Sequence, residues 1–196
     1  IMNLYSSEDQ VADIKQGQEY KWYGAVPNLI PSVSFQTRVR DESLGGDNPY
    51  RWEEVNTWDI FASRRVLIFS LPGAFTPTCS TMQLPEFERL ASKFYEKEID
   101  AIYCISVNDA FVMNAWAKQQ GLEAVEVLPD GNGKFTEDMG MLVGKQNLGF
   151  GNRSWRYAMV VDNGRITDFF MEDGKEDDHE LDPYAYTNPN YILDKI

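Results

Sequence analysis

A buried strand that leads directly into a helix carrying one cysteine is the feature that most constrains this fold. Residues 66–71 read Val-Leu-Ile-Phe-Ser-Leu, an almost wholly apolar run of the length expected for a strand covered on both faces. The next segment begins at Pro72 and reaches Cys79 after a Thr76-Pro77 pair. Threonine is a favoured N-cap, and proline is favoured just after it because its missing N–H would be unpaired there. The pattern predicts a helix that starts at Pro77, with Cys79 in its first turn.

Cys79 therefore occupies a position that favours a thiolate. The first turn of a helix presents unpaired backbone N–H groups and the positive end of the helix dipole, and both stabilise an anion. The competing interpretation is that Cys79 is a small apolar core residue, which is the commoner role of an arbitrary cysteine. A fast thiol enzyme also needs groups that stabilise its transition state, so a hydroxyl and a fixed cation are expected near the sulfur.

Strand and helix patterns alternate through the rest of the chain. Strands are predicted at 101–107, 125–128, 156–161 and 165–171, and helices at 109–120, 135–139 and from Asn188 onward. Asn108 is the expected cap of the helix over 109–120 and Gly121 its end, and Asn163-Gly164 is a tight hairpin signal. Parallel βαβ units closed by a hairpin and a helix predict an α/β, thioredoxin-like fold, with a central mixed β-sheet flanked by helices.

Composition fits one enzyme-sized domain and disfavours several kinds of partner. The 196 residues are 43% hydrophobic, enough for one substantial core, and no apolar run approaches the roughly 20 residues that cross a bilayer. A net charge of −13 disfavours nucleic acid and anionic membrane surfaces. Two cysteines argue against a disulfide scaffold and favour a reducing, cytoplasmic location. With His179 as the one histidine and no Cys-x-x-Cys, no zinc or other metal site is expected.

Several segments, in the same order, resemble the peroxiredoxins. The spacing Pro72-x-x-x-Thr76-x-x-Cys79 matches the active-site signature of that family. The runs PGAFTPTCS, LPEF, SVNDAFVMNAW and GFGNRSWRYAMVV resemble its type II, peroxiredoxin 5-like subfamily. The resemblance covers residues 27–196, so we expect a peroxiredoxin domain there. Residues 1–26 are expected to form an N-terminal extension, either a flexible segment or an arm across a dimer partner.

The resemblance implies a thiol peroxidase that reduces hydrogen peroxide or an organic hydroperoxide. The Cys79 thiolate attacks the terminal peroxide oxygen and becomes a sulfenic acid, while water or an alcohol leaves. On the family pattern Thr76 forms hydrogen bonds with the peroxide, and Pro72 shields the sulfur from water. Arg156 stabilises the thiolate and the developing charge, with Arg153 as a secondary candidate. The resemblance also implies a homodimer and no cofactor.

Each of these assignments has a structural alternative. An N-cap role explains Thr76 fully from the sequence alone, and an arginine at the start of a strand, such as Arg156, is usually a solvated charge. Leu148 and Phe150 suggest an apolar rim for the substrate pocket, and their alternative is ordinary loop packing. The acidic run over 172–182 is expected to be a solvated loop, because it lacks the ligand spacing of a calcium loop.

The second cysteine and one substituted position bear on the mechanism. Cys104 lies in an apolar strand, which predicts a buried, inert thiol. Some relatives carry a resolving cysteine in the C-terminal segment, but residues 173–196 contain none. We therefore expect a single-cysteine mechanism with an external reductant, either glutathione with glutaredoxin or thioredoxin. Gln83 stands where many relatives have histidine, so a contribution of that position to hydrogen bonding or proton transfer is not carried over.

Pro85 predicts an irregularity in the helix that carries Cys79. Pro85 removes a backbone hydrogen bond early in the Cys79 helix and should kink it, either as a simple bend or as a device that releases the first turn.

The alternative function is a redox sensor or holdase switched by oxidation of Cys79. Turnover separates the two functions, since a sensor is oxidised once whereas an enzyme consumes many equivalents of peroxide.

Overall fold

One five-stranded sheet forms the centre of the fold. The structure is a computed structural model and describes residues 26–196, so the expected N-terminal extension lies outside the described residues except for Val26. The strands are β3 (Arg65–Ser70), β4 (Ala101–Ser106), β5 (Val125–Pro129), β8 (Tyr157–Asp162) and β9 (Arg165–Met171), in the spatial order β5-β4-β3-β8-β9. β3, β4 and β5 run parallel, whereas β8 and β9 pair antiparallel. The predicted mixed sheet is confirmed.

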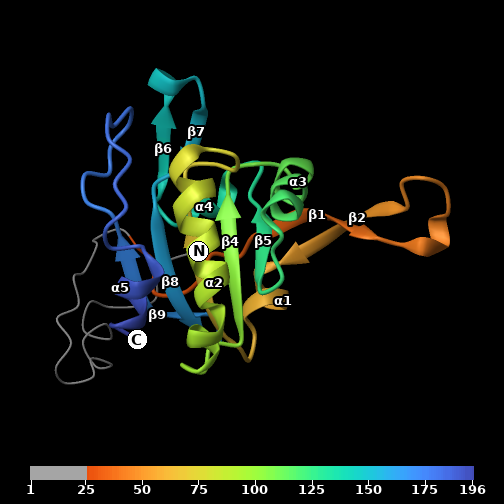
Figure 1. The fold of residues 1–196 in the computed structure, drawn as a ribbon, viewed down its shortest axis with the longest axis horizontal. Helices are drawn as coiled ribbons and strands as arrows, with labels where there is room; N and C mark the ends of the chain where they lie inside the picture. Colours follow the sequence, from red (N-terminus) through yellow and green to blue (C-terminus); the bar gives the residue numbers. More distant parts are fainter. Residues whose placement is uncertain (1–25) are drawn as a thin grey trace, which may run out of the picture.

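Helices cover both faces of this sheet (Figure 1). Successive residues of a strand point to opposite faces, and β3 is apolar on both. Leu67 and Phe69 pack in one core with α2 (Leu84–Tyr95), α3 (Ala110–Gln120) and α5 (Pro189–Leu193). Val66 and Ile68 pack in the other core with α1 (Thr57–Phe61) and α4 (Lys134–Asp138). Two cores explain why β3 reads as a continuous apolar run.

Two hairpins outside the central sheet are not predicted by the sequence. β1 (Ser34–Arg40) and β2 (Tyr50–Asn56) form an antiparallel arm that projects from the body of the molecule (Figure 1). β6 (Leu142–Lys145) and β7 (Gly151–Ser154) form a shorter hairpin at the top of the view. Phe35 is the one buried residue in β1 and β2, so these strands lack the apolar alternation that marks a strand with one buried face.

The predicted helices are found within about one residue of the predicted bounds, but the cap predicted for α3 differs. Gly121 ends α3 in the left-handed conformation, with φ of 65°, and the Asn188 side chain caps α5 by accepting from Tyr191 N. The start of α3 differs from the prediction, because Asp109 rather than Asn108 accepts a hydrogen bond from Val112 N, at 2.9 Å. A capping side chain must reach the N–H of the second or third helical residue, and Asp109 is one residue closer.

The helix that carries Cys79 begins at Pro77, as predicted. It continues through a π-helical turn over Cys79–Gln83, in which Leu84 N donates to Cys79 O, and then becomes α2. Pro85 lies in the first turn of α2, directly after the π-helical turn. The disturbance predicted at Pro85 therefore takes the form of a widened turn, which changes the helical hydrogen-bond pattern just before the residue that lacks an N–H.

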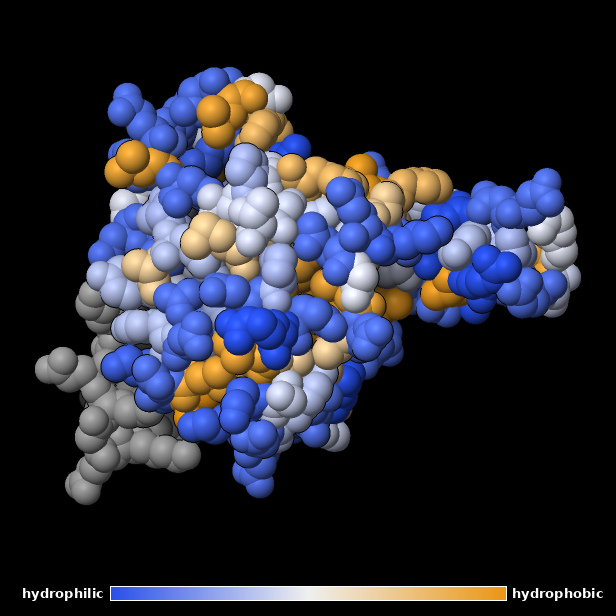
Figure 2. Space-filling model, in the orientation of Figure 1, coloured by the Kyte–Doolittle hydropathy of each residue, from blue (hydrophilic) through white to orange (hydrophobic). Residues whose placement is uncertain are grey.

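The surface is predominantly hydrophilic on the side where α2 lies. Figure 2 shows separate apolar patches set among hydrophilic residues over this face, including one at the outer end of the β6–β7 hairpin. Leu148, beside that hairpin, is 57% exposed. Among residues 26–196, no helix has the length and apolar character needed to cross a membrane.

Candidate active site

The loop before the Cys79 helix is held by side-chain hydrogen bonds. Ala74 N donates to Asn108 Oδ1 at 2.9 Å, and Ser106 Oγ donates to the same oxygen at 2.6 Å. Asn108, whose predicted capping role is wrong, thus fastens the loop to the end of β4. Phe75 adopts a positive φ of 63°, a conformation that costs a bulky residue energy and needs support from its surroundings.

Thr76 stands at the start of the helix, but its side chain does not act as the predicted cap. Its carbonyl accepts the first helical bond, from Ser80 N at 3.0 Å, as an N-cap carbonyl should. Its hydroxyl instead donates to Gly73 O at 2.7 Å. That bond closes the turn before the helix, and it fixes the hydroxyl on the side of the loop rather than over the helix N–H groups.

Cys79 and Arg156 meet in the interior of the protein. Arg156 Nη1 lies 3.6 Å from Cys79 Sγ, and the two residues are 1% and 0% exposed. Arg156 comes immediately before β8, which pairs with β3, so the sheet brings the arginine to the strand end from which the cysteine loop departs. The sulfur therefore has a permanent positive charge beside it in a site closed to bulk water.

The Arg156 guanidinium is bound on every nitrogen. Nη1 also donates to Gln83 Oε1, Nη2 forms an ion pair with Asp182 Oδ1 at 2.6 Å, and Nε donates to Pro183 O at 3.1 Å. Burial lowers the pKa of Arg156, but the nearby Cys79 and Asp182 outweigh burial and raise it above the ordinary value. The group remains a cation with a fixed orientation.

Gln83 accepts from Arg156 through its side-chain oxygen. Its amide nitrogen is buried and has no hydrogen-bond partner within the part of the chain that the structure describes. A glutamine side chain does not titrate, so this residue can orient Arg156 but cannot transfer a proton.

Arg153 supports the loop instead of contacting the sulfur. Its Nη1 lies 3.5 Å from Pro72 O, and its Nε donates to Phe150 O at 3.1 Å. A Cβ atom on Gly73 would lie 2.8 Å from Arg153 Nη1, so a larger residue there would displace this guanidinium. Burial lowers the pKa of Arg153, although the charge of Cys79 partly opposes this effect. The second arginine thus braces the turn that precedes the helix.

Of the remaining predicted residues, Pro72 lies beside Arg156, whereas Leu148 and Phe150 have no described contact with Cys79. Pro72 lines a cavity of about 10 Å³ together with Arg156, Asp182 and Pro183, a space for no more than about one water molecule. Leu148 projects into solvent, and Phe150 packs under Arg153, whose guanidinium carbon is 5.4 Å from the ring centre. The contacts described for Leu148 and Phe150 do not reach Cys79, so their role in the pocket stays a prediction.

Cys104 lies in a different chemical environment from Cys79. It sits in the middle of β4, in register with Phe69, and is fully buried in the core that α2 covers. Burial raises the pKa of the Cys104 thiol well above its ordinary value, and the charge of Cys79 adds to this effect. The prediction of a buried Cys104 is confirmed, and both thiols are free.

The acidic run over 172–182 is exposed along most of its length, as predicted, but the prediction is wrong for Glu172 and does not include the ion pair of Asp182. Glu172 is 1% exposed, and its Oε1 accepts four hydrogen bonds, from the backbone N–H groups of Ala185, Tyr186 and Thr187 and from the Thr187 hydroxyl. Asp182 pairs with Arg156 at the other end. Residues 182–187, the C-terminal strap, are thereby fixed over the active site.

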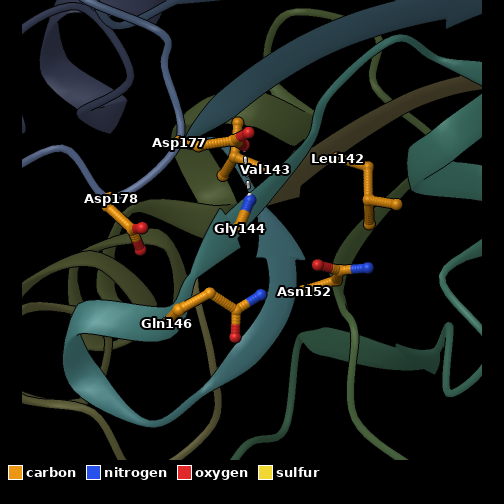
Figure 3. Close-up of a pocket in the computed structure, with 7 residues that line it drawn as sticks. All are labelled: Leu142, Val143, Gly144, Gln146, Asn152, Asp177 and Asp178. Carbon is orange, nitrogen blue, oxygen red and sulfur yellow. Dashed lines mark hydrogen bonds between the residues drawn. The ribbon is translucent and has the colours of Figure 1, made fainter.

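A larger pocket lies away from the cysteine. It has a volume of about 270 Å³ and is lined by Leu142, Val143, Gly144, Gln146, Asn152, Asp177 and Asp178 (Figure 3). Asp177 Oδ1 accepts a hydrogen bond from Gly144 N at 2.7 Å and so attaches the acidic run over 172–182 to β6. Within residues 26–196 there is no group of three or more His, Cys, Asp or Glu side chains that can hold a metal ion.

Comparison with known proteins identifies the class. The Redoxin family matches residues 48–185. A peroxiredoxin of Rhizobium etli is 60% identical over 164 residues, which are 84% of this chain and 92% of that protein. The structure is similar to that of a Plasmodium falciparum antioxidant protein, a 1-Cys peroxiredoxin, with 35% identity and a TM-score of 0.78 over 86% of this chain and 97% of that one. Peroxiredoxin 5 from Alvinella pompejana matches with 32% identity and a TM-score of 0.63, over 76% and 89%.

A thioredoxin-like fold with a buried cysteine at a helix start and an arginine on its sulfur defines a thiol-dependent redoxin. More narrowly, the chain belongs to the peroxiredoxins, in the type II, peroxiredoxin 5-like subfamily. It is a thiol peroxidase, an oxidoreductase that reduces peroxides at the expense of thiols.

Proposed function

We propose that this peroxiredoxin reduces hydrogen peroxide and organic hydroperoxides through Cys79 alone, with an external thiol as the reductant. The observation that carries the proposal is the contact of Arg156 with the sulfur of Cys79, at 3.6 Å in a buried site. The thiolate attacks the terminal peroxide oxygen, so an S–O bond forms as the O–O bond breaks. The departing hydroxide or alkoxide takes up a proton and leaves as water or an alcohol.

Three residues of the loop and the sheet assist this step. Arg156 stabilises the thiolate and, through its rigid fork of donors, the negative charge that develops on the leaving oxygen. Thr76 offers its hydroxyl to the peroxide, for which it must release Gly73 O or accept a bond while keeping it. Pro72 covers the cavity beside Arg156 and restricts the access of water to the sulfur.

The single-cysteine mechanism follows from the environment of the second thiol. Cys104 is fully buried on a central strand, and burial raises its pKa well above the ordinary value, so it is a poor nucleophile toward an oxidised Cys79. The sulfenic acid therefore condenses with an external thiol and releases water. A second thiol then attacks the mixed disulfide and regenerates Cys79. The related Plasmodium falciparum protein is likewise a 1-Cys peroxiredoxin.

The burial of Cys79 requires a change of structure during the cycle. A bulky reductant does not reach a sulfur that is 0% exposed, so the first helical turn must open after oxidation. The π-helical turn over Cys79–Gln83 is the natural place for this, since a π-helical turn is a rare interruption of the α-helical hydrogen-bond pattern and is frequent at functional sites. Pro85 shortens the hydrogen-bonded part of the helix that must be melted.

Peroxide consumption measured with each reductant system separately tests this proposal. We expect many turnovers per molecule with glutathione and glutaredoxin, with thioredoxin and its reductase, or with both. Consumption of a single equivalent, whichever reductant is supplied, would contradict the peroxidase cycle and support a sensor or holdase switched by oxidation of Cys79. A Cys79→Ser variant provides the background rate.

A further inference from the structure

Asp182 makes the one ionic contact described for the Arg156 guanidinium. Its Oδ1 lies 2.6 Å from Nη2, and the adjacent carbonyl, Pro183 O, accepts from Nε at 3.1 Å. These two acceptors bind one edge of the guanidinium plane and leave Nη1 for Gln83 and Cys79. A planar fork held along one edge cannot rotate, so the direction of Nη1 is fixed by residues on the opposite side of the group.

We propose that Asp182 is a positioning residue for the peroxidase reaction, delivered by the C-terminal strap to aim Arg156 at the sulfur of Cys79. The inference rests on the proposed function and adds a residue to it that contacts neither the sulfur nor the peroxide. The strap thereby becomes part of the active site, although no sequence motif marks it.

The strap is fixed directly after its contact with Arg156. Glu172 Oε1 accepts hydrogen bonds at 2.9 Å from the backbone N–H groups of Ala185, Tyr186 and Thr187. Beside Asp182, the Tyr184 hydroxyl donates to Glu86 Oε2 at 2.7 Å. Burial raises the pKa of Tyr184, and the hydrogen bond to Glu86 and its charge raise it further, so the hydroxyl keeps its proton and remains a donor.

These attachments join the strap to the two elements that carry the reacting groups. Glu172 follows β9, whose partner β8 begins directly after Arg156, and Glu86 lies in the first turn of α2, the helix that continues from Cys79. The Arg156 guanidinium also lies over the Tyr184 ring, with its carbon 5.6 Å from the ring centre. The strap thus sets the position of Arg156 relative to the helix that carries the sulfur.

The contribution of Asp182 is geometric rather than purely electrostatic. Its side chain is 48% exposed, so solvent screens the ion pair. Its negative charge also partly offsets the positive charge that Arg156 presents to Cys79. Removing Asp182 therefore increases the net positive charge near the sulfur but takes away the acceptor of Nη2, so the guanidinium is held less firmly in its orientation. Only the second effect slows a reaction that needs donors at defined positions.

Two reactions of the same sulfur separate these effects. Alkylation by iodoacetamide needs a thiolate and access to it, whereas oxidation by hydrogen peroxide also needs an oriented donor for the leaving oxygen. Asp182→Ala should lower the second-order rate constant for peroxide roughly tenfold and change the alkylation rate less than about twofold. Asp182→Asn keeps an acceptor oxygen and should recover most of the peroxide rate. Glu180→Ala, an exposed change in the same loop, serves as the control and should leave both rates unchanged.

The outcomes distinguish this inference from the function on which it rests. An equal loss of the alkylation and peroxide rates in both Asp182→Ala and Asp182→Asn would show that Asp182 only maintains the structure. Unchanged peroxide oxidation in Asp182→Ala would show that Arg156 needs no positioning by Asp182. Either result overturns the inference while the wild-type protein still reacts with peroxide. Failure of the wild-type protein to be oxidised overturns the proposed function instead.

Discussion

Cys79 and Cys104 are both fully buried, yet only one of them has the surroundings of a reactive thiol. Cys79 lies at a helix start with a guanidinium nitrogen 3.6 Å from its sulfur. Cys104 lies in the middle of β4, between apolar neighbours, and burial raises the pKa of its thiol. Burial by itself therefore does not separate a structural from a catalytic cysteine. The difference comes from fixed positive charge, which offsets the cost of removing a thiolate from water.

Replacing each cysteine in turn should have the largest effect and tests whether the two thiols differ in function. Cys79→Ser should abolish peroxide turnover, because a serine hydroxyl is not ionised at neutral pH and is a poor nucleophile toward peroxide. Cys104→Ser should keep turnover within about twofold, although burying a hydroxyl destabilises the fold by about 1–3 kcal/mol. Steady-state peroxide consumption with an excess of reductant measures both. Loss of turnover in a folded Cys104→Ser variant would show that the two thiols act together.

The two arginines provide a smaller test of the same idea. Arg156→Lys should lower the rate constant for peroxide roughly a hundredfold, because lysine keeps the charge but loses the fork that reaches the sulfur, Gln83 and Asp182 together. Arg153→Lys should cost only a few-fold, since that residue braces the loop through Pro72 O. Stopped-flow oxidation of both variants gives the comparison. A larger loss in Arg153→Lys would mean that Arg153, not Arg156, is the arginine on which the reaction depends.

The raised pKa of Cys104 predicts a modest dependence of stability on pH. The folded state holds this proton more tightly than the unfolded state, whose thiol has an ordinary pKa of 9.0. Stability due to this group is thus complete below pH 9 and falls above it, by up to about 1.4 kcal/mol per pH unit. In urea unfolding under reducing conditions, the free-energy difference between wild type and Cys104→Ala should shrink by about 1 kcal/mol from pH 8.5 to 10. Parallel pH curves would contradict the account of Cys104.

The sequence predicts the parts of this molecule that are locally coded. The apolar run of β3, the proline at the helix start and the Asn163-Gly164 turn each act within a few residues, and all three are found. Arg156 is predictable only from the resemblance to a known family. Sheet pairing between β3 and β8 then brings it to the sulfur.

The features that the sequence does not predict depend on contacts between segments that are far apart in the chain. Glu172 and Asp182 stand in an acidic run whose members have the same residue chemistry as solvated ones, and only the folded strap separates them. Asn108 does not cap α3, because Asp109 does so, and the Asn108 side chain instead accepts a hydrogen bond from Ala74 N. The sequence does not predict the arm of β1 and β2, because its strands contain one buried residue, Phe35, and therefore no apolar alternation.

The mass of the protein after oxidation tests most directly the claim that Cys79 reacts with peroxide while Cys104 takes no part. One equivalent of hydrogen peroxide added to the reduced protein should add a single oxygen, located on Cys79 by peptide mapping. Glutathione added afterwards should convert that species into a mixed disulfide at Cys79 and leave Cys104 as a free thiol. Loss of two hydrogens instead, with a peptide that joins Cys79 to Cys104, would contradict the single-cysteine mechanism and make Cys104 the resolving thiol.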